Sequence, residues 1–208
     1  MHDARQTIES FLNATAARQP TPGGGSVTAL VGALSAAMGE MVLNYSIGKK
    51  DLVVFESELR PALAEFHKAR QLLLGLMIED QGAYEAMVQI RKRPADAPDR
   101  AAACDAALLA CIRIPEAIAA TAIAVMDLVD KMVNFVNYHL LSDFAVCADL
   151  AMATVRCAVY NVRVNLKQVT DPDDRRRIES TIGQLLTHAA SVIQRVSPRI
   201  WERHAQGA

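Results

Sequence analysis

The spacing of apolar residues is the feature that most constrains the fold of this 208-residue chain. Apolar side chains recur three and four positions apart along almost the whole sequence, whereas runs that alternate β-branched and aromatic residues with polar ones are missing. Spacings of three and four place side chains on one face of an α-helix, while a strand needs a period of two. The sequence therefore predicts an all-α protein, an antiparallel bundle of about five to seven helices forming a single domain over residues 1–208.

Prolines, glycines and hydroxyl residues set the predicted helix limits. Ser26 and Ser142 are predicted N-caps, because a serine hydroxyl accepts a hydrogen bond from a free N–H in the first turn. We expect a break or bend at Pro61 and a kink near Pro115, since proline cannot donate the helical hydrogen bond. The predicted helices span residues 4–17, 26–47, 52–92, 99–133, 142–169 and 171–201.

The second predicted helix is unusually apolar. Residues 27–47 are long enough for a membrane span, but Glu40 lies mid-way, and a carboxylate is costly inside a bilayer. Gly32, Ala36 and Gly39 recur on one side, where small residues allow another helix to approach closely. We therefore expect the central helix of the bundle and no membrane partner.

Charge and cysteine content exclude several classes of protein. The chain has 22 basic and 23 acidic residues, so it lacks a basic field that would attract nucleic acid or an anionic membrane. Its first ten residues lack the apolar run of a signal peptide, so we expect a cytoplasmic protein. No C-x-x-C pair or metal-finger spacing occurs, which favours buried free thiols for Cys104, Cys111, Cys147 and Cys157.

A glycine-rich loop precedes the second predicted helix. Gly23, Gly24 and Gly25 stand between Pro22 and Ser26, and glycines leave backbone N–H groups open to close approach. Such a loop can hold an anion or the polar edge of a ring, although a flexible joint before a helix explains the same residues. The spacing matches neither a Walker nor a Rossmann loop.

The loop belongs to a longer series of motifs. Residues 22–26, 44–50, 78–85, 114–115, 141–143 and 160–165 follow one another in this order. Together they resemble the signature of a family comprising bacterial methenyltetrahydrofolate cyclohydrolases and the cyclodeaminase half of formiminotransferase-cyclodeaminase. The resemblance covers nearly the whole chain, and its most specific part runs from the glycine loop to Lys50.

This resemblance implies an enzyme of one-carbon metabolism that hydrolyses 5,10-methenyltetrahydrofolate reversibly to 10-formyltetrahydrofolate. We expect no attached formiminotransferase domain, which favours this cyclohydrolase over a formiminotetrahydrofolate cyclodeaminase that releases ammonia. A non-catalytic folate-binding bundle is a further alternative. The resemblance also implies a tetrahydrofolate derivative as substrate, no tightly bound cofactor and a homodimer; an excess of apolar helix faces favours the homodimer as well.

The resemblance places the catalytic general acid and base at Asp80. Helical phase sets Asp80 on the side of Leu73, Met77 and Tyr84, whereas Glu79 points about 100° away. Burial on this apolar side would raise the carboxyl pKa and allow proton exchange near neutrality. A surface acid or an ion-pair partner is the alternative interpretation.

The resemblance implies a larger set of substrate-binding residues. Lysines suit the glutamate carboxylates of a folate, although they also complement a helix C-terminus. Asparagines one turn apart suit the amide edge of a pterin, or pair with backbone inside the bundle. The implied set is Pro22, Gly23, Gly24, Gly25, Ser26, Lys49, Lys50, Asn137, Ser142, Asp143, Asn161 and Asn165.

Two positions depart from the family pattern near Asn137. Val136 stands where glycine is common, and His139 stands where asparagine is common. A histidine here could add an acid–base group, but it is more often structural. Glu65 and His67 are only two residues apart, unlike the Glu and His ligands of bundle metal sites, so we expect no metal.

Overall fold

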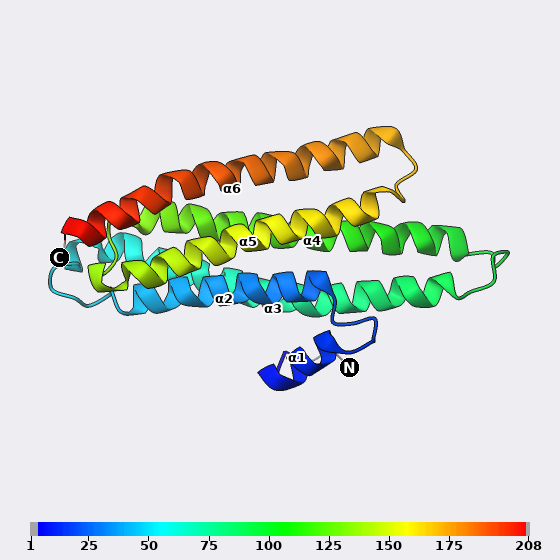
Figure 1. Ribbon diagram of the computed structural model, residues 1–208, viewed down its shortest axis with the longest axis horizontal. Helices are drawn as coiled ribbons and strands as arrows, with labels where there is room; N and C mark the ends of the chain where they lie inside the picture. The colour runs from blue at the N-terminus through cyan, green and yellow to red at the C-terminus, as the bar shows by residue number, and fades with distance from the viewer. Residues whose placement is uncertain (1–3, 207–208) are drawn as a thin grey trace.

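The computed structural model describes residues 4–206, which form six α-helices and two short 3-10 helices without any strand (Figure 1). The all-α prediction is confirmed. In chain order the elements are α1 (Ile8–Ala16), α2 (Gly24–Asn44), η1 (Val53–Phe55), α3 (Glu56–Arg91), α4 (Arg100–Met132), η2 (Tyr138–Leu140), α5 (Leu141–Leu166) and α6 (Pro172–Gln206).

Four helices form the central bundle. α2 contacts α3 and α5, and α4 contacts the same two helices from the other side, so each helix has two close neighbours. α6 covers the groove between α4 and α5, and α1 lies apart from the bundle beside α2 (Figure 1). α1 contributes only one buried side chain, Phe11. The core thus lies mainly among α2, α3, α4 and α5.

The two predicted serine caps are wrong. Gly23 is the N-cap of α2 and Leu140 that of α5, and neither makes a side-chain capping bond. Ser26 and Ser142 therefore lie inside the first helical turns. The Ser26 hydroxyl is directed to α3, where it donates to Asp80, and Ser142 is exposed. The Ser26 hydroxyl thus bonds to a residue of another helix, and not to an N–H group in the first turn of its own helix.

Both long helices continue through their internal prolines. α3 is unbroken at Pro61, and α4 runs through Pro115, which is buried. The predicted break at Pro61 therefore does not occur. Packing against neighbouring helices stabilises each helix where the proline cannot donate its hydrogen bond.

α2 approaches its neighbours through small residues. A Cβ atom added to Gly32 would lie 3.0 Å from Thr154 on α5, and one added to Gly39 would lie 2.3 Å from the ring of Phe66 on α3. The Ser35 hydroxyl donates to the carbonyl oxygen of Cys147 at 2.7 Å, which links α2 to α5 in the buried interior. These contacts place α2 between α3 and α5, as the small-residue stripe predicts.

The carboxylate of Glu40 is paired within the bundle. Arg70 on α3 donates to both Glu40 oxygens, and His67 Nδ1 lies 3.2 Å from Glu40 Oε2. α2 and α4 are both long and apolar enough to cross a membrane by composition alone. In this fold, 56% of the apolar stretch of α2 and 39% of that of α4 are buried.

The four cysteines differ in their surroundings, so the prediction of buried thiols is wrong for three of them. Only Cys147 is buried; Cys104 and Cys111 are half-buried, and Cys157 is exposed on α5. Burial raises the pKa of the Cys147 thiol to about 12. Helical phase decides this difference, because these cysteines occupy different faces of α4 and α5.

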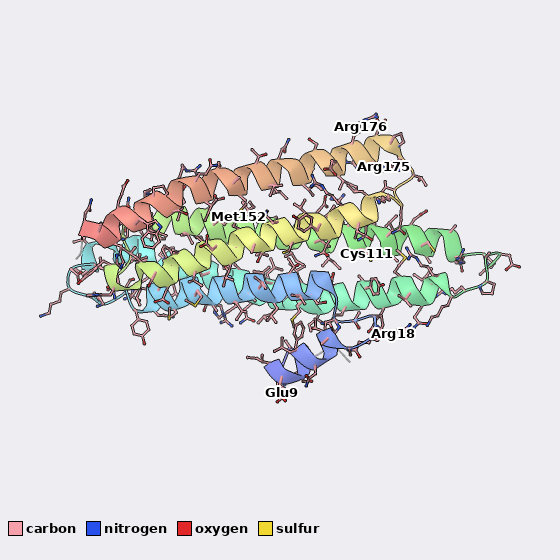
Figure 2. All side chains as sticks on the ribbon, in the orientation of Figure 1. Glu9, Arg18, Cys111, Met152, Arg175 and Arg176 are labelled. Carbon is pink, nitrogen blue, oxygen red and sulfur yellow. The ribbon has the colours of Figure 1, made fainter. Side chains whose placement is uncertain are left out.

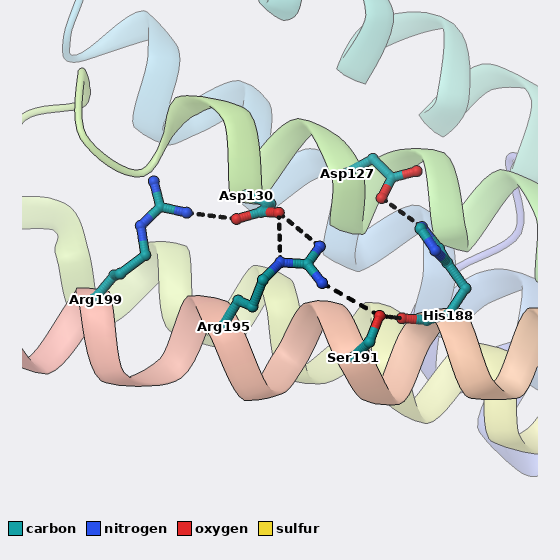
Figure 3. A network of polar contacts seen from close by, with 6 residues as sticks. All are labelled: Asp127, Asp130, His188, Ser191, Arg195 and Arg199. Carbon is teal, nitrogen blue, oxygen red and sulfur yellow. Dashed lines mark hydrogen bonds and ion pairs between the residues drawn. The ribbon is translucent and has the colours of Figure 1, made fainter.

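Polar contacts fix α6 against α4. Asp130 accepts hydrogen bonds from Arg195 and Arg199, and His188 Nε2 lies 2.7 Å from Asp127 Oδ1 (Figure 3). Arg203 extends the same row by donating to two backbone carbonyls after α4, those of Val133 and Val136. Apolar residues of α6 cover the core, while these polar contacts fix the position of α6 along α4.

Candidate active site

A cavity of about 260 Å³ lies at the end of the bundle where α2 begins. The loop before α2 forms one side, and residues of α3, α4 and α5 form the others. Figure 2 shows Arg18 in this loop and Cys111 on α4 in the same half of the molecule. The cavity is lined by Pro20, Thr21, Gly23, Gly24, Gly25, Asp80, Tyr84, Cys111, Pro115, Asn161, Val164 and Asn165.

Asp80 is the acidic group of this cavity. It is half-buried on α3, and its Oδ2 accepts a hydrogen bond of 2.7 Å from the Ser26 hydroxyl. Burial raises the pKa of Asp80 above its ordinary value of 3.8, while hydrogen bonds from the hydroxyl and backbone N–H of Ser26 act in the opposite direction. The raised pKa brings this carboxyl closer to the range in which it can both accept and donate a proton.

Two glycines allow this arrangement. A Cβ atom added to Gly25 would lie 2.0 Å from Asp80 Oδ1, and one added to Gly24 would lie 2.9 Å from Asn161 Oδ1. Both distances are too short for a real side-chain contact. The first turn of α2 therefore carries glycine where α3 and α5 present their polar side chains to the cavity.

Asn161 and Asn165 form the polar wall on α5. Asn161 Nδ2 donates to Thr28 Oγ1 at 3.3 Å, and Asn165 Nδ2 donates at 3.0 Å to the carbonyl oxygens of Cys111 and Asn161. Among residues 4–206, nothing donates to either asparagine Oδ1. The backbone pairing fixes Asn165 in place and leaves its amide oxygen to accept a hydrogen bond from a ligand.

Several cavity residues are absent from the predicted set. Tyr84 lies one turn after Asp80 on α3, and Cys111 and Pro115 face it from α4. Thr21 Oγ1 donates to Glu85 Oε1 at 2.7 Å and so ties the loop to α3. Helical spacing from Asp80 was the signal that could have identified Tyr84, whereas no local pattern marks Cys111.

The predicted binding residues form two groups within one chain. The glycines of the loop, Asp80 and the two asparagines share one cavity. Pro22 and Ser26 are not among its lining residues, although Ser26 donates to Asp80. The other group lies beyond the opposite end of α2, whose 21 residues span about 30 Å. That second group is Lys49, Lys50, Asn137, Ser142 and Asp143.

At this far end, internal contacts occupy Asn137. Its backbone N–H donates to Ser46 Oγ at 2.9 Å, and its Oδ1 accepts from the backbone N–H of His139 at 3.2 Å. The ring of His139 is exposed and packs on Tyr138, with ring centroids 3.7 Å apart. Val136 is fully buried. The departures at Val136 and His139 are therefore far from the Asp80 cavity of the same chain.

Comparisons with known proteins agree with this fold and cavity. A family profile described as Formiminotransferase-cyclodeaminase matches residues 7–184. The chain belongs to this family. It is 33% identical over 198 residues to the methenyltetrahydrofolate cyclohydrolase of Methylorubrum extorquens, an alignment that covers 92% of this chain and 94% of the relative.

Two further relatives show the range of this family. The chain is 31% identical to the formimidoyltransferase-cyclodeaminase of Sus scrofa, of which it spans 37%. The crystal structure of formiminotetrahydrofolate cyclodeaminase from Thermotoga maritima superimposes with a TM-score of 0.88 at 27% identity, covering 95% of this chain and 97% of that one. The family assignment and the all-helical fold thus have independent support.

Within residues 4–206, no cluster of three or more His, Cys, Asp or Glu side chains is arranged to hold a metal ion. The chemistry described below is that of the groups that line the cavity. Its acid–base group is Asp80, and its hydrogen-bonding groups are Asn161, Asn165 and the loop backbone.

Proposed function

We propose that this protein is a methenyltetrahydrofolate cyclohydrolase, which hydrolyses 5,10-methenyltetrahydrofolate reversibly to 10-formyltetrahydrofolate. The observation that carries this proposal is the half-buried carboxyl of Asp80, with a raised pKa, in a cavity that also offers amide oxygens and backbone N–H groups. The similarity to the Methylorubrum cyclohydrolase along almost its full length supports the same substrate.

The reaction needs a group that accepts a proton and then returns it. The Asp80 carboxylate takes a proton from water as the water oxygen bonds to the cationic methenyl carbon. Asp80 then gives this proton to N5 as the carbon–N5 bond breaks. The hydroxyl of the adduct loses its own proton to solvent and becomes the formyl carbonyl on N10. One carboxyl with a raised pKa serves both steps.

The substrate is cationic at its bridge and anionic at its glutamate tail. An ionised Asp80 stabilises the bridge, and the free amide oxygens of Asn161 and Asn165 suit the N–H groups of a pterin. Tyr84 adds an aromatic surface beside the carboxyl. The tetrahydrofolate derivative is the substrate of the proposed reaction, which requires no tightly bound cofactor.

Cyclodeamination of formiminotetrahydrofolate is the second candidate reaction. It would close the substrate to the same methenyl compound and release ammonia, with Asp80 acting as the acid. The names of the Sus scrofa and Thermotoga maritima proteins favour this alternative. The sequence identity favours the cyclohydrolase, because the chain is 33% identical to the Methylorubrum cyclohydrolase and 27% identical to the Thermotoga cyclodeaminase.

We further propose that the protein is a cytoplasmic homodimer without nucleic-acid or membrane partners. The balanced charge supports the absence of a polyanionic partner. Large exposed apolar residues on α2 and α5, including Leu34 and Tyr160, support self-association.

The decisive assay follows the absorbance of 5,10-methenyltetrahydrofolate after the purified protein is added. We expect hydrolysis well above the rate in buffer, with 10-formyltetrahydrofolate as product. A parallel reaction with formiminotetrahydrofolate measures ammonia release. Hydrolysis at the buffer rate together with ammonia release would replace the cyclohydrolase by the cyclodeaminase. Inactivity in both assays would support a non-catalytic folate-binding bundle.

A further inference from the structure

Three of the described helices contain an internal proline. These prolines are Pro61 in α3, Pro115 in α4 and Pro198 in α6. In an α-helix each N–H group donates to the carbonyl oxygen four residues earlier, and proline has no N–H group. Each proline therefore leaves one carbonyl oxygen without its helical donor, and these oxygens belong to Ser57, Cys111 and Gln194.

The three freed carbonyls differ in their surroundings. On α3 and α6, the proline and the residue that carries the freed carbonyl are exposed. On α4, Pro115 is buried and Cys111 is half-buried, and both line the Asp80 cavity. Water can bond to an exposed carbonyl oxygen, whereas one in the interior needs a donor from the protein. The freed carbonyl of α4 is therefore the one that requires a partner.

Asn165 on α5 is this partner. Its Nδ2 donates to the carbonyl oxygen of Cys111 at 3.0 Å and to that of Asn161 at 3.0 Å. Within residues 4–206, no side chain donates to the freed carbonyls of α3 and α6. The side-chain bond thus occurs at the buried proline and at neither of the exposed ones.

The two carbonyls fix the orientation of the Asn165 amide. A backbone carbonyl oxygen can only accept a hydrogen bond, so the amide nitrogen must face both of them. Rotation of the amide by half a turn would place Oδ1 against two acceptors. Asn165 lines the Asp80 cavity, and Oδ1 is the amide atom that remains available to a ligand there. Asn165 therefore offers the cavity an acceptor and not a donor.

The orientation of Asn165 depends on the proline at position 115. The proline ring clashes with the carbonyl four residues earlier and so turns that carbonyl away from its own helix. On α4 this is the Cys111 carbonyl, which bonds to α5. A residue with an N–H group at position 115 would draw the carbonyl back along the axis of α4 and weaken its bond to Asn165.

We propose that Pro115 is a positioning residue of the Asp80 cavity. It frees the Cys111 carbonyl, which holds Asn165 with its amide oxygen available to accept a hydrogen bond from the ligand. For a folate, the matching donor is an N–H group of the pterin. This last step rests on the proposed function, whereas the effect of Pro115 on Asn165 does not.

A thermal-unfolding cycle tests the link between Pro115 and Asn165 without substrate. Asn165→Ala leaves the Cys111 carbonyl without a donor while Pro115 is present. In a Pro115→Ala chain the new N–H group supplies that donor, so the same substitution should cost less. We expect Asn165→Ala to lower the melting temperature by at least about 2 °C more in the wild type than in the Pro115→Ala chain. Equal losses in the two chains would overturn the proposal.

The two exposed prolines provide matched controls. Pro61→Ala and Pro198→Ala also restore a helical N–H group, but at sites where the freed carbonyl belongs to an exposed residue. The loss of melting temperature caused by Asn165→Ala should be the same in each of these chains as in the wild type, because distant substitutions are additive. A smaller loss in either control chain would show that the coupling is not specific to Pro115, and would overturn the proposal.

A kinetic cycle with 5,10-methenyltetrahydrofolate tests the role of Pro115 in the site. Pro115→Ala should lower kcat/KM about tenfold, which is the scale of one positioned hydrogen bond. Most of this change should be in KM, because Asn165 binds the pterin and does not transfer the proton. In an Asn165→Ala chain, Pro115→Ala should change kcat/KM by less than about twofold. Pro61→Ala should retain the wild-type kcat/KM.

The outcomes separate this proposal from the proposed function. If the wild type lacks hydrolase and deaminase activity, the proposed function fails, while the thermal-unfolding cycle still tests the link between Pro115 and Asn165. If the wild type is active and Pro115→Ala is equally harmful with and without Asn165, the proline ring acts independently and the proposal is overturned. A folded Pro115→Ala protein with wild-type kcat/KM overturns it as well. Circular dichroism of each variant establishes that it is folded.

Discussion

Two glycines of α2 allow close approach of α3 at different ends of the helix, with different results. Gly25 makes room for the carboxylate of Asp80 beside a cavity, whereas Gly39 makes room for the fully buried ring of Phe66. At both glycines the backbone of α2 lies so close to a side chain of α3 that an added Cβ atom would clash with it. The comparison shows that one kind of helix contact positions the Asp80 carboxyl at one end of α2 and stabilises the core near the other.

Gly25→Ala should produce the largest effect at the site end. The added Cβ atom would lie 2.0 Å from Asp80 Oδ1, so the carboxyl must move away from its position in the cavity. We expect kcat/KM to fall about a hundredfold or more, because acid–base groups contribute on this scale and depend on their geometry. The matched control is Gly75→Ala on α3, where no atom lies within 4 Å and activity should be unchanged.

Gly39→Ala should instead affect stability. The added atom would lie 2.3 Å from the Phe66 ring, which is fully buried and has no solvent-facing position to adopt. We expect a loss of about 1–3 kcal/mol in the free energy of unfolding, measured by chemical denaturation. Gly183→Ala, with open space around it, is the control. A Gly39→Ala protein that is as stable as the wild type but inactive would contradict the separation of the two ends.

Ser26→Ala should shift the pH dependence of hydrolysis. The Ser26 hydroxyl donates to Asp80 and lowers its pKa, so loss of this bond raises the pKa further. Because the proposed hydrolysis requires ionised Asp80, the acidic limb of the kcat/KM profile should move to higher pH. Activity far above this limb should change less than activity on it. An unmoved limb would show that another group controls the ionisation.

The smallest predicted effect concerns stability and Asp80. Burial makes the folded-state pKa higher than the unfolded-state value, so ionisation of Asp80 destabilises the fold. The fold therefore gains stability from a protonated Asp80. This gain is fully present below the unfolded-state pKa and is lost as the pH rises through the folded-state pKa. Asp80→Asn removes this dependence. Its melting temperature at neutral pH should therefore equal or slightly exceed that of the wild type, and a large decrease would indicate a structural role.

The fold was predictable because its main signal is local. Spacings of three and four along the chain identify helices without knowledge of their partners, and the small residues of α2 indicate close packing. The serine caps were mispredicted for the opposite reason. A serine near a helix start has the same local pattern whether or not it caps, and the partner of Ser26 is Asp80, 54 positions away.

The site was predictable only in part. The glycine loop, Asp80, Asn161 and Asn165 meet in one cavity, as the resemblance implies. Cys111 enters that cavity through the packing of α4 against α3 and α5, which no spacing within its own helix encodes. Sequence position also did not show that Lys49 and Ser142 lie at the other end of the bundle, since this depends on the antiparallel course of α2 and α5.

Steady-state kinetics of Asp80→Asn with 5,10-methenyltetrahydrofolate tests the central claim most directly. The substitution keeps the shape of the side chain and removes its ionisable group. We predict that kcat falls about a hundredfold or more while helicity and folate binding persist, because Asp80 transfers the proton in the chemical step. A folded Asp80→Asn protein that hydrolyses the substrate at nearly the wild-type rate would contradict this account.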